Sequence, residues 1–128
     1  MTPDCPFCTR IESSEPMAAN DSAIAFPDGF PVSDGHTLIV PRRHVTSLWD
    51  LSAGERQAIW DLDSEVRAMI TSKHSPDGFN VGVNDGEAAG QTIDHAHLHI
   101  IPRYSGDVPD PRGGIRLVLP ERALYWSE

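Results

Sequence analysis

The chain is poor in basic residues, in cysteine and in long apolar runs. Its 128 residues contain 10 Lys and Arg against 19 Asp and Glu, which gives a formal net charge of −9. A nucleic-acid binder is expected to carry a basic face, so this charge argues against that class. No apolar run approaches the roughly 18 residues of a membrane span, and residues 1–5 lack a leader pattern. We therefore expect a cytoplasmic protein with no nucleic-acid partner and no membrane partner.

The length and composition are those of one ordinary globular domain. A chain of 128 residues can bury a real core, and 39% hydrophobic with 23% charged residues is typical of a folded protein. Internal repeats and low-complexity tracts are absent from the sequence. We expect a single domain over residues 1–128.

Three histidines alternate with apolar residues late in the chain. Residues 95–101 read His-Ala-His-Leu-His-Ile-Ile. Alternation of period two is typical of a strand, so His95, His97 and His99 are expected on one face, about 6.5–7 Å apart at ~3.3 Å per residue. A strand that gives a whole face to imidazoles forgoes packing there, which indicates a functional use.

A second cluster of unusual residues is the pair Cys5 and Cys8 near the N-terminus. In a cytosolic protein the C-x-x-C spacing is typical of a redox pair or of half a zinc site. A redox pair is expected in a thioredoxin-like β-α-β context, which the extreme N-terminus does not offer. A zinc site needs two more ligands, which the chain's histidines could supply. Two inert thiols are the third alternative.

The remaining pattern predicts an α+β fold. Ser52 and Glu55 form a capping box that opens a helix as far as about Lys73. An apolar stripe along this helix is expected to face the core: it comprises Ile59, Leu62, Val66, Met69 and Ile70. Strands are expected at 24–28, 36–41 and 79–84, in the stretch that carries His95, His97 and His99, and at 115–120. This order indicates a mostly antiparallel sheet with the helix on one face.

Residues 95–101 resemble the signature of the histidine triad family, H-φ-H-φ-H-φ-φ with φ apolar, and they match it without departure. The likeness extends over nearly the whole chain. It implies a HIT-like fold: an α+β domain with a mostly antiparallel five-stranded sheet, one long helix and a short N-terminal helix. It also implies a homodimer.

The resemblance implies a role for each candidate residue. His97 would be the nucleophile that forms a covalent nucleotidyl-histidine, and His95, His99 and His36 would complete the catalytic group. Asp28 would hold the ribose of a nucleotide, although on the sequence alone it is equally a turn residue. The residues implied to contact the phosphate are Asn84, Gly90, Gln91 and Thr92. Given the net charge, local dipoles, imidazoles and a few arginines would have to hold that phosphate.

Zinc-binding members of the family carry a cysteine pair like Cys5 and Cys8. The resemblance implies that His44 and His95 complete a closed Cys₂His₂ site. Such a zinc would be structural, and the chemistry would not require it.

The type of reaction also follows from the resemblance. Members that transfer a nucleotide to a sugar phosphate carry glutamine where this chain has His99, so this chain resembles the hydrolases. The pair Gln91 and Thr92, and Arg103 together with Gly106 and Asp107, resemble the bacterial zinc-containing hydrolases of dinucleoside polyphosphates. We expect hydrolysis at the α-phosphate of a purine nucleotide conjugate with release of a nucleoside monophosphate. The alternatives are an adenosine phosphoramidase, a nucleotide sensor without turnover, and a zinc enzyme that uses all three triad histidines as ligands.

Overall fold

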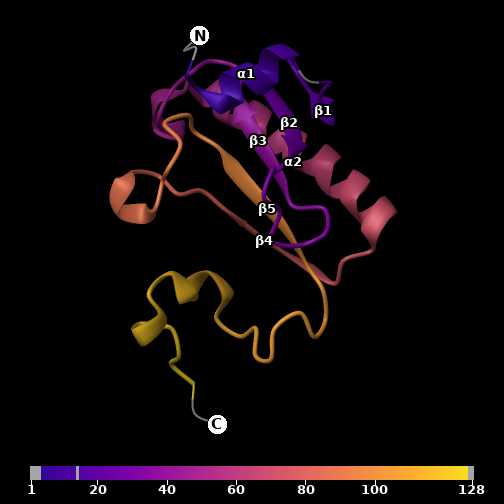
Figure 1. Ribbon diagram of the computed structural model, residues 1–128, viewed down its shortest axis with the longest axis vertical. Coiled ribbons are helices and arrows are strands. Elements are labelled where there is room, and N and C mark those ends of the chain that lie inside the picture. The colour runs from indigo at the N-terminus through magenta and orange to yellow at the C-terminus, as the bar shows by residue number, and fades with distance from the viewer. Residues whose placement is uncertain (1–3, 14, 127–128) are drawn as a thin grey trace.

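The computed structural model describes residues 4–13 and 15–126, and it contains one five-stranded sheet in which every neighbouring pair is antiparallel. The strand order is β1-β2-β3-β5-β4. In chain order the elements are α1 (Pro6–Ser13), β1 (Ala18–Ala19), β2 (Ala23–Pro27), β3 (Thr37–Pro41), η1 (Leu48–Asp50), α2 (Ala53–His74), β4 (Gly78–Gly82), η2 (Glu87–Ala89), β5 (Leu98–Arg103), η3 (Gly114–Val118) and η4 (Pro120–Arg122), where η marks a 3₁₀ helix (Figure 1). The expected α+β class, with one long and one short N-terminal helix, is confirmed.

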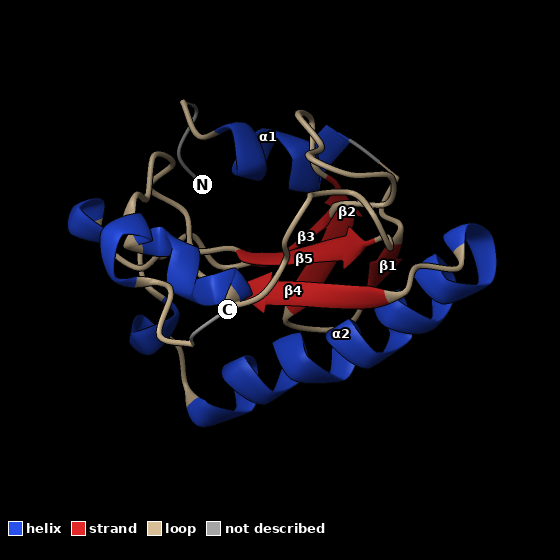
Figure 2. Cartoon of the chain, turned by 90° about the horizontal axis from the view of Figure 1, so that it is seen from below, coloured by secondary structure: helices blue, strands red, loops and turns tan. Residues whose placement is uncertain are grey.

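The two α-helices lie on opposite faces of the sheet (Figure 2). One apolar cluster fills the space between the sheet and α2, and a second lies between the sheet and α1. The first contains Ile39, Ile59, Leu62, Val66, Ile70, Leu98 and Ile100; the second contains Cys5, Phe7, Cys8, Ile24, Phe26, Leu38 and Val40. The cysteine pair is therefore part of the core beneath α1.

The helix α2 begins where the capping box predicts. The Ser52 hydroxyl accepts from the Glu55 N–H at 3.1 Å, and the Glu55 carboxylate accepts from the Ser52 N–H at 2.9 Å. These two bonds satisfy backbone donors that have no partner in the first turn. The expected apolar stripe faces the sheet, except that Met69 is 40% exposed. The helix ends at Ser75, whose backbone is left-handed with φ of 49°.

The strand β5 begins at Leu98, so the prediction that all three triad histidines alternate along one strand is wrong for His95 and His97. Both lie in the bend that precedes the strand. The cause is a backbone bond outside the sheet: the N–H of Ala96 donates to the carbonyl of Val45 at 2.7 Å. His99 does lie in the strand, opposite Leu38 of β3, on the face that α1 covers.

The expected strand over residues 115–120 is also wrong, because this stretch curls into η3 and η4. Gly113 and Gly114 enter it with φ of 92° and 36°, in the left-handed region that strands do not use. The guanidinium of Arg116 then ties the turn by donating to the carbonyl of Ala123 at 2.7 Å. The segment after β5 extends away from the sheet (Figure 1).

The other expected strands are confirmed within two residues at each end, as β2, β3 and β4. The two-residue strand β1 has no pattern of its own in the sequence, and the count of five strands came from the family resemblance. Among the described residues, the structure contains no helix long and apolar enough to cross a bilayer.

Candidate functional site

Four side chains from three segments converge beneath α1. The Sγ of Cys5 lies 3.4 Å from Nδ1 of His95, and the Sγ of Cys8 lies 3.3 Å from Nδ1 of His44. Cys8 Sγ is also 3.6 Å from Nδ1 of His95, and the two Nδ1 atoms are 3.2 Å apart. All four atoms lie within 4.8 Å of one another. The structure thus brings together the four residues expected to hold a metal.

These separations fit a tetrahedral ion. With Zn–S of about 2.3 Å and Zn–N of about 2.0–2.1 Å, a regular tetrahedron places sulfur and nitrogen about 3.5 Å apart and two nitrogens about 3.3 Å apart. The observed values of 3.3–3.6 Å and 3.2 Å agree with both. The donor set, two thiols and two imidazoles, is the one that zinc prefers in structural sites.

The tautomer of His95 also suits a ligand. Its Nε2 lies 2.8 Å from the backbone carbonyl of Pro41, and a carbonyl can only accept, so Nε2 carries the hydrogen. The Nδ1 atom then presents its lone pair to the two cysteines. A ligating histidine commonly donates its second nitrogen to a carbonyl in this way. Burial lowers the pKa of His95, which keeps the ring neutral.

His97 has the opposite tautomer. Its Nδ1 lies 2.8 Å from the carbonyl of His95, so Nδ1 carries the hydrogen and Nε2 keeps its lone pair. The ring is buried between Phe7 and His99, with centroid distances of 4.9 Å and 5.0 Å. His97 thus offers a nitrogen nucleophile that needs no separate base to remove a proton.

His36, His99 and Asp28 form a third group, beside His97. The Val32 N–H donates to Nδ1 of His36 at 3.1 Å, so a neutral His36 carries its hydrogen on Nε2. That Nε2 lies 3.0 Å from Nδ1 of His99 and 3.3 Å from a carboxylate oxygen of Asp28. His36 therefore donates toward His99, and His99 carries its own hydrogen on Nε2.

Burial keeps both of these imidazoles uncharged. It lowers the pKa of His36, with partial compensation from the Asp28 carboxylate. Burial, aided by the neighbouring His97 and His36, lowers the pKa of His99 to about 4. Both rings are neutral near pH 7 and act through oriented N–H groups instead of full charges.

The three triad histidines do not converge on one point. His95 turns its free nitrogen to the cysteines, while the Nδ1 of His97 is bound to a carbonyl. No cluster of potential ligands within residues 4–13 and 15–126 includes His97. The alternative of a zinc ion held by all three triad histidines therefore has no support in the geometry.

The carboxylate of Asp28 makes two contacts within the protein. One carboxylate oxygen accepts from the Phe30 N–H at 2.8 Å, which makes it the turn residue that the sequence also allowed. The other oxygen lies beside His36. The backbone N–H of Asp28 donates to the carbonyl of His36 at 3.0 Å and closes the loop that carries both groups.

The loop between β4 and β5 carries the residues expected to contact a phosphate. The Gln91 amide accepts from the Gly86 N–H at 2.9 Å and donates to the carbonyls of Thr46 and Ile93 at 2.8 Å and 3.0 Å. The N–H of Gly90 donates to the carbonyl of Glu87 at 2.9 Å. Gln91 and Gly90 thus shape the loop with these groups. Asn84 and Thr92 are exposed on it.

Two contributors to the site were missed by sequence reasoning. Phe7 touches both His95 and His97, and the carbonyl of Pro41 sets the tautomer of His95. The signal for Phe7 was its place between Cys5 and Cys8, which ties it to any metal site. The role of Pro41 belongs to its backbone, and side-chain identity gives no signal for that.

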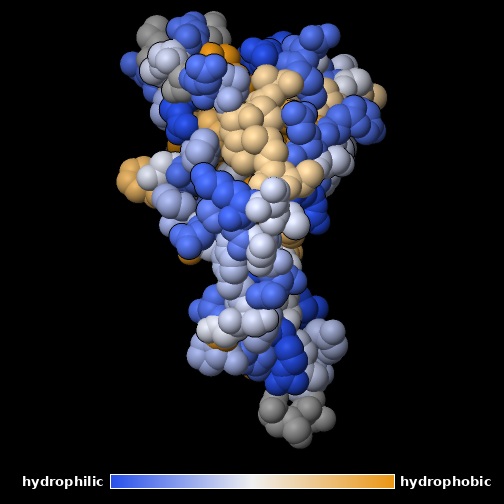
Figure 3. All heavy atoms as spheres, turned by 90° about the vertical axis from the view of Figure 1, so that its right-hand side faces the viewer, coloured by the Kyte–Doolittle hydropathy of each residue, from blue (hydrophilic) through white to orange (hydrophobic). Residues whose placement is uncertain are grey.

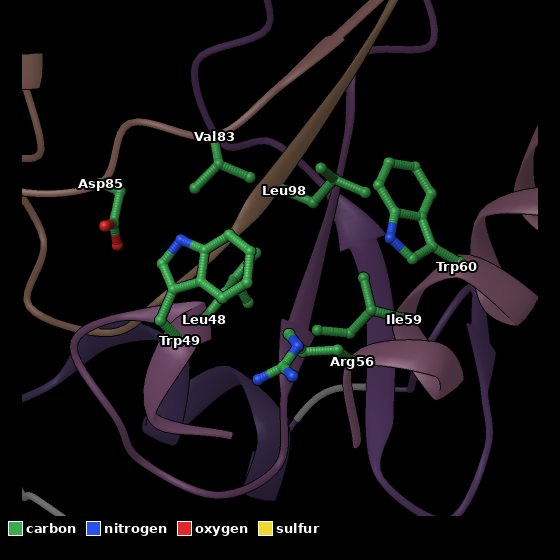
Figure 4. A pocket seen from close by; sticks show the side chains of 8 residues that line it. All are labelled: Leu48, Trp49, Arg56, Ile59, Trp60, Val83, Asp85 and Leu98. Atoms are coloured by element: carbon green, nitrogen blue, oxygen red, sulfur yellow. The ribbon is translucent and has the colours of Figure 1, made fainter. Parts of the chain in front are cut away.

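An apolar hollow lies elsewhere in the molecule. It has a volume of about 320 Å³ and lies against Leu98 and Ile59, on the α2 side of the sheet (Figure 4). The indoles of Trp49 and Trp60 flank it, and none of the six histidines lines it. The hollow is therefore separate from the histidine site.

The low pKa of His99 gives a testable dependence of stability on pH. The unfolded state takes up the proton near pH 6.5, whereas folded His99 takes it up only near pH 4. Stability from neutral His99 is thus complete above pH 6.5 and is lost as the pH falls toward 4. His99→Asn should lose less unfolding free energy than wild type over that range, measured by urea titration at several pH values. His74→Asn is the control, and equal slopes for wild type and His99→Asn would contradict the assignment.

Comparison with known proteins agrees with this geometry. Residues 12–106 match the family described as "HIT domain". The chain is 38% identical over 106 residues to an uncharacterized HIT-like protein of Mycoplasma genitalium, covering 80% of this chain and 75% of the relative. It is 33% identical over 98 residues to the bifunctional bis(5'-adenosyl)-triphosphatase/adenylylsulfatase FHIT of Arabidopsis thaliana, covering 77% of this chain and 54% of that protein.

Among solved structures, a Zn-bound histidine triad family protein from Mycobacterium smegmatis superposes with a TM-score of 0.73 and 29% identity, covering 90% of each chain. The family match covers well over half of the sequence and contains all three triad histidines. This chain belongs to the histidine triad, or HIT, family.

Proposed function

We propose that the protein hydrolyses a purine nucleotide conjugate through a covalent nucleotidyl-histidine on His97. The observation that carries the proposal is the bond from Nδ1 of His97 to the carbonyl of His95, at 2.8 Å. It leaves the Nε2 lone pair free, in a buried imidazole beside the neutral His99. Membership of a family that includes nucleotide hydrolases adds to this support.

The reaction would run in two displacements at one phosphorus. Nε2 of His97 attacks the α-phosphorus, and the bond from phosphorus to the leaving group breaks with its electron pair on the leaving group. Water then attacks the same phosphorus, the bond to Nε2 breaks, and a nucleoside monophosphate departs. The carbonyl of His95 stabilises the positive charge that the ring carries while it is nucleotidylated.

His99 would assist at the phosphoryl oxygens. Its hydrogen lies on Nε2, because His36 donates to its Nδ1 at 3.0 Å. A neutral, oriented N–H donor stabilises charge that develops on a non-bridging oxygen. Asp28 lies 3.3 Å from His36 and is our candidate to hold the ribose hydroxyls; Asn84, Gly90, Gln91 and Thr92 stay our candidates for the phosphate loop.

A dinucleoside polyphosphate is the substrate class that we favour, and an adenosine phosphoramidate is the alternative. The similarity to a bis(5'-adenosyl)-triphosphatase/adenylylsulfatase supports an adenylyl group as the part transferred. The sequence indicated Arg103 as a residue typical of polyphosphate hydrolases, but its guanidinium already has partners within the protein. Its guanidinium binds both carboxylate oxygens of Asp107 at 2.8 Å and 2.7 Å, and also Asn80 at 2.6 Å.

A rapid-quench experiment tests the proposal. Wild type and His97→Ala are mixed with α-labelled diadenosine tetraphosphate or adenosine phosphoramidate, and both AMP and acid-labile adenylyl-protein are followed. We expect label and AMP from wild type, and a loss of at least about 10³-fold in His97→Ala because the nucleophile is gone. His74→Ala, a histidine outside the site, is the matched control. Nucleotide binding without label or AMP in wild type would identify a sensor instead of an enzyme.

Zinc is the metal that we propose for the site formed by Cys5, Cys8, His44 and His95. Its four donors and their spacing fit a closed structural site. When bound, the ion would act as a cross-link between α1, the segment after β3 and the segment before β5. Burial raises the pKa of the Cys5 thiol, so the metal must displace a proton to bind there. Because the thiols must stay reduced, we propose the cytoplasm as the compartment.

Metal analysis of purified variants tests this assignment. Wild type should contain one zinc per chain, and Cys5→Ala should lose it and unfold at a lower temperature, because the cross-link is gone. His97→Ala should retain the metal, since its nitrogens do not face the cysteines. Retention of zinc in Cys5→Ala together with its loss in His97→Ala would assign the metal to the triad instead.

We further propose that two copies of the chain associate. The strand β4 lies at the edge of the sheet, where backbone groups are open to pairing. The segment after β5 exposes large apolar side chains, each between 47% and 75% exposed: Ile115, Leu117, Val118, Leu119, Leu124 and Tyr125. On the face seen in Figure 3, hydrophilic side chains predominate on the narrow part that this segment forms. A second copy is the simplest partner for apolar residues that project from the body.

Sedimentation measurements test the association. Wild type should sediment as a dimer at micromolar concentration, and Val118→Glu should shift it toward monomer by placing a charge in the interface. Phe30→Glu is the control, because Phe30 is also exposed but lies outside the C-terminal segment. A wild type that is monomeric at all concentrations, or a dimer unaffected by Val118→Glu, would contradict this surface.

A further inference from the structure

Phe7 lies between the two cysteines in sequence and contacts the triad on the face of the sheet that α1 covers. It occupies the first turn of α1 and is buried. Its ring meets the ring of His97 edge-on, with centroids 4.9 Å apart and an angle of 74° between the planes. It also meets His95 at 5.9 Å and 76°, and Phe26 at 5.7 Å.

The backbone bond of His97 does not by itself fix the plane of the imidazole. The contact from Nδ1 to the carbonyl of His95 holds one ring atom, and the ring can still tilt about that contact. Two neighbouring rings limit the tilt: Phe7, with its centroid 4.9 Å away, and His99, with its centroid 5.0 Å away. Since an edge-to-face pair has a preferred angle, Phe7 sets the orientation of the Nε2 lone pair.

The place of Phe7 depends in turn on its neighbours. The helix α1 has 8 residues, too few to be stable without tertiary contacts. Cys5 and Cys8 anchor its start against His95 and His44. Arg10 holds its end, because its guanidinium lies 4.1 Å from the centre of the Phe26 ring and donates to the carbonyl of Pro27 at 3.3 Å. Phe7 is fixed between these two anchors.

We infer that Phe7 is a positioning residue for the nucleophile: its ring holds the His97 imidazole in the plane from which Nε2 attacks phosphorus. The inference rests on the proposed function of His97. It differs from a role in substrate contact, because Phe7 would act on the rate of nucleotidyl transfer and leave substrate affinity unchanged. Cys5 and Cys8 affect His97 indirectly, because they hold the first turn of α1, which carries the Phe7 ring.

The test compares Phe7→Leu with Ile24→Ala. Both changes reduce a buried side chain of the same cluster, but Ile24 is neither one of the ring partners of Phe7 nor an anchor of α1. Each variant is measured for zinc content, thermal unfolding, KM, the rate of adenylyl-protein formation, and the ¹⁵N chemical shifts of the His97 ring. Phe7→Met, whose longer and more flexible side chain can fill the space differently, replaces Phe7→Leu if the latter does not fold.

We expect Phe7→Leu to slow adenylyl-protein formation by ~10-fold or more, since small misplacement of a reacting atom is costly, while KM and zinc content stay as in wild type. The His97 ring should keep the tautomer that its bond to the carbonyl of His95 fixes, while its ¹⁵N signals should shift or broaden as the ring tilts. Ile24→Ala should keep the rate within about twofold, because it leaves the Phe7 ring and both anchors of α1 in place. A rise in KM alone would make Phe7 a wall of the substrate site, and equal rates and ¹⁵N shifts in both variants would overturn the inference.

The two proposals fail in different ways. If wild type forms no adenylyl-protein, the proposed function fails, and the ¹⁵N shifts still report whether Phe7 orients His97. If wild type is labelled and Phe7→Leu is labelled equally fast, the proposed function stands and the role of Phe7 is refuted.

Discussion

The hydrogen bond from Nδ1 of His97 to the carbonyl of His95 is the contact on which the site depends. It connects His95, which faces the cysteines, to His97, whose Nε2 keeps a free lone pair. A carboxylate would also fix the tautomer of His97, but it would place a negative charge beside a phosphate substrate. In a chain with a net charge of −9, a neutral backbone acceptor orients the imidazole without adding to the repulsion.

The same solution recurs around the site. The carbonyl of Pro41 locates the hydrogen of His95, and the N–H of Val32 locates that of His36, which then locates that of His99. Burial lowers the pKa of His95, His36 and His99, so that none of the three carries a full charge near neutral pH. The site therefore works with oriented lone pairs and N–H groups, which cost less to bury than ions. An acidic protein can build such a site without recruiting lysines or arginines.

Some of this could be predicted from the sequence. The capping box at Ser52 predicted the start of α2, and the three middle strands follow from apolar and β-branched runs. The spacing of Cys5 and Cys8 left three alternatives open, and only the family resemblance indicated His44 and His95 as their partners. The alternation in the triad predicted the face of His99 correctly but misplaced His95 and His97. An alternation of period two indicates which face of a strand a residue occupies. It does not indicate where the strand begins, which here depends on the bond from the N–H of Ala96 to the carbonyl of Val45.

The tautomers could not have been predicted, because their partners are backbone atoms that every residue type supplies. The path of the backbone selects the tautomers, and a glycine contributes to that path. Gly35 shapes the loop between Asp28 and His36 with φ of 93°, and a Cβ there would lie 3.1 Å from His74 and 3.2 Å from Pro102. This loop presents the Val32 N–H to His36. A residue without a side chain thus helps to decide which nitrogen of His99 carries a hydrogen.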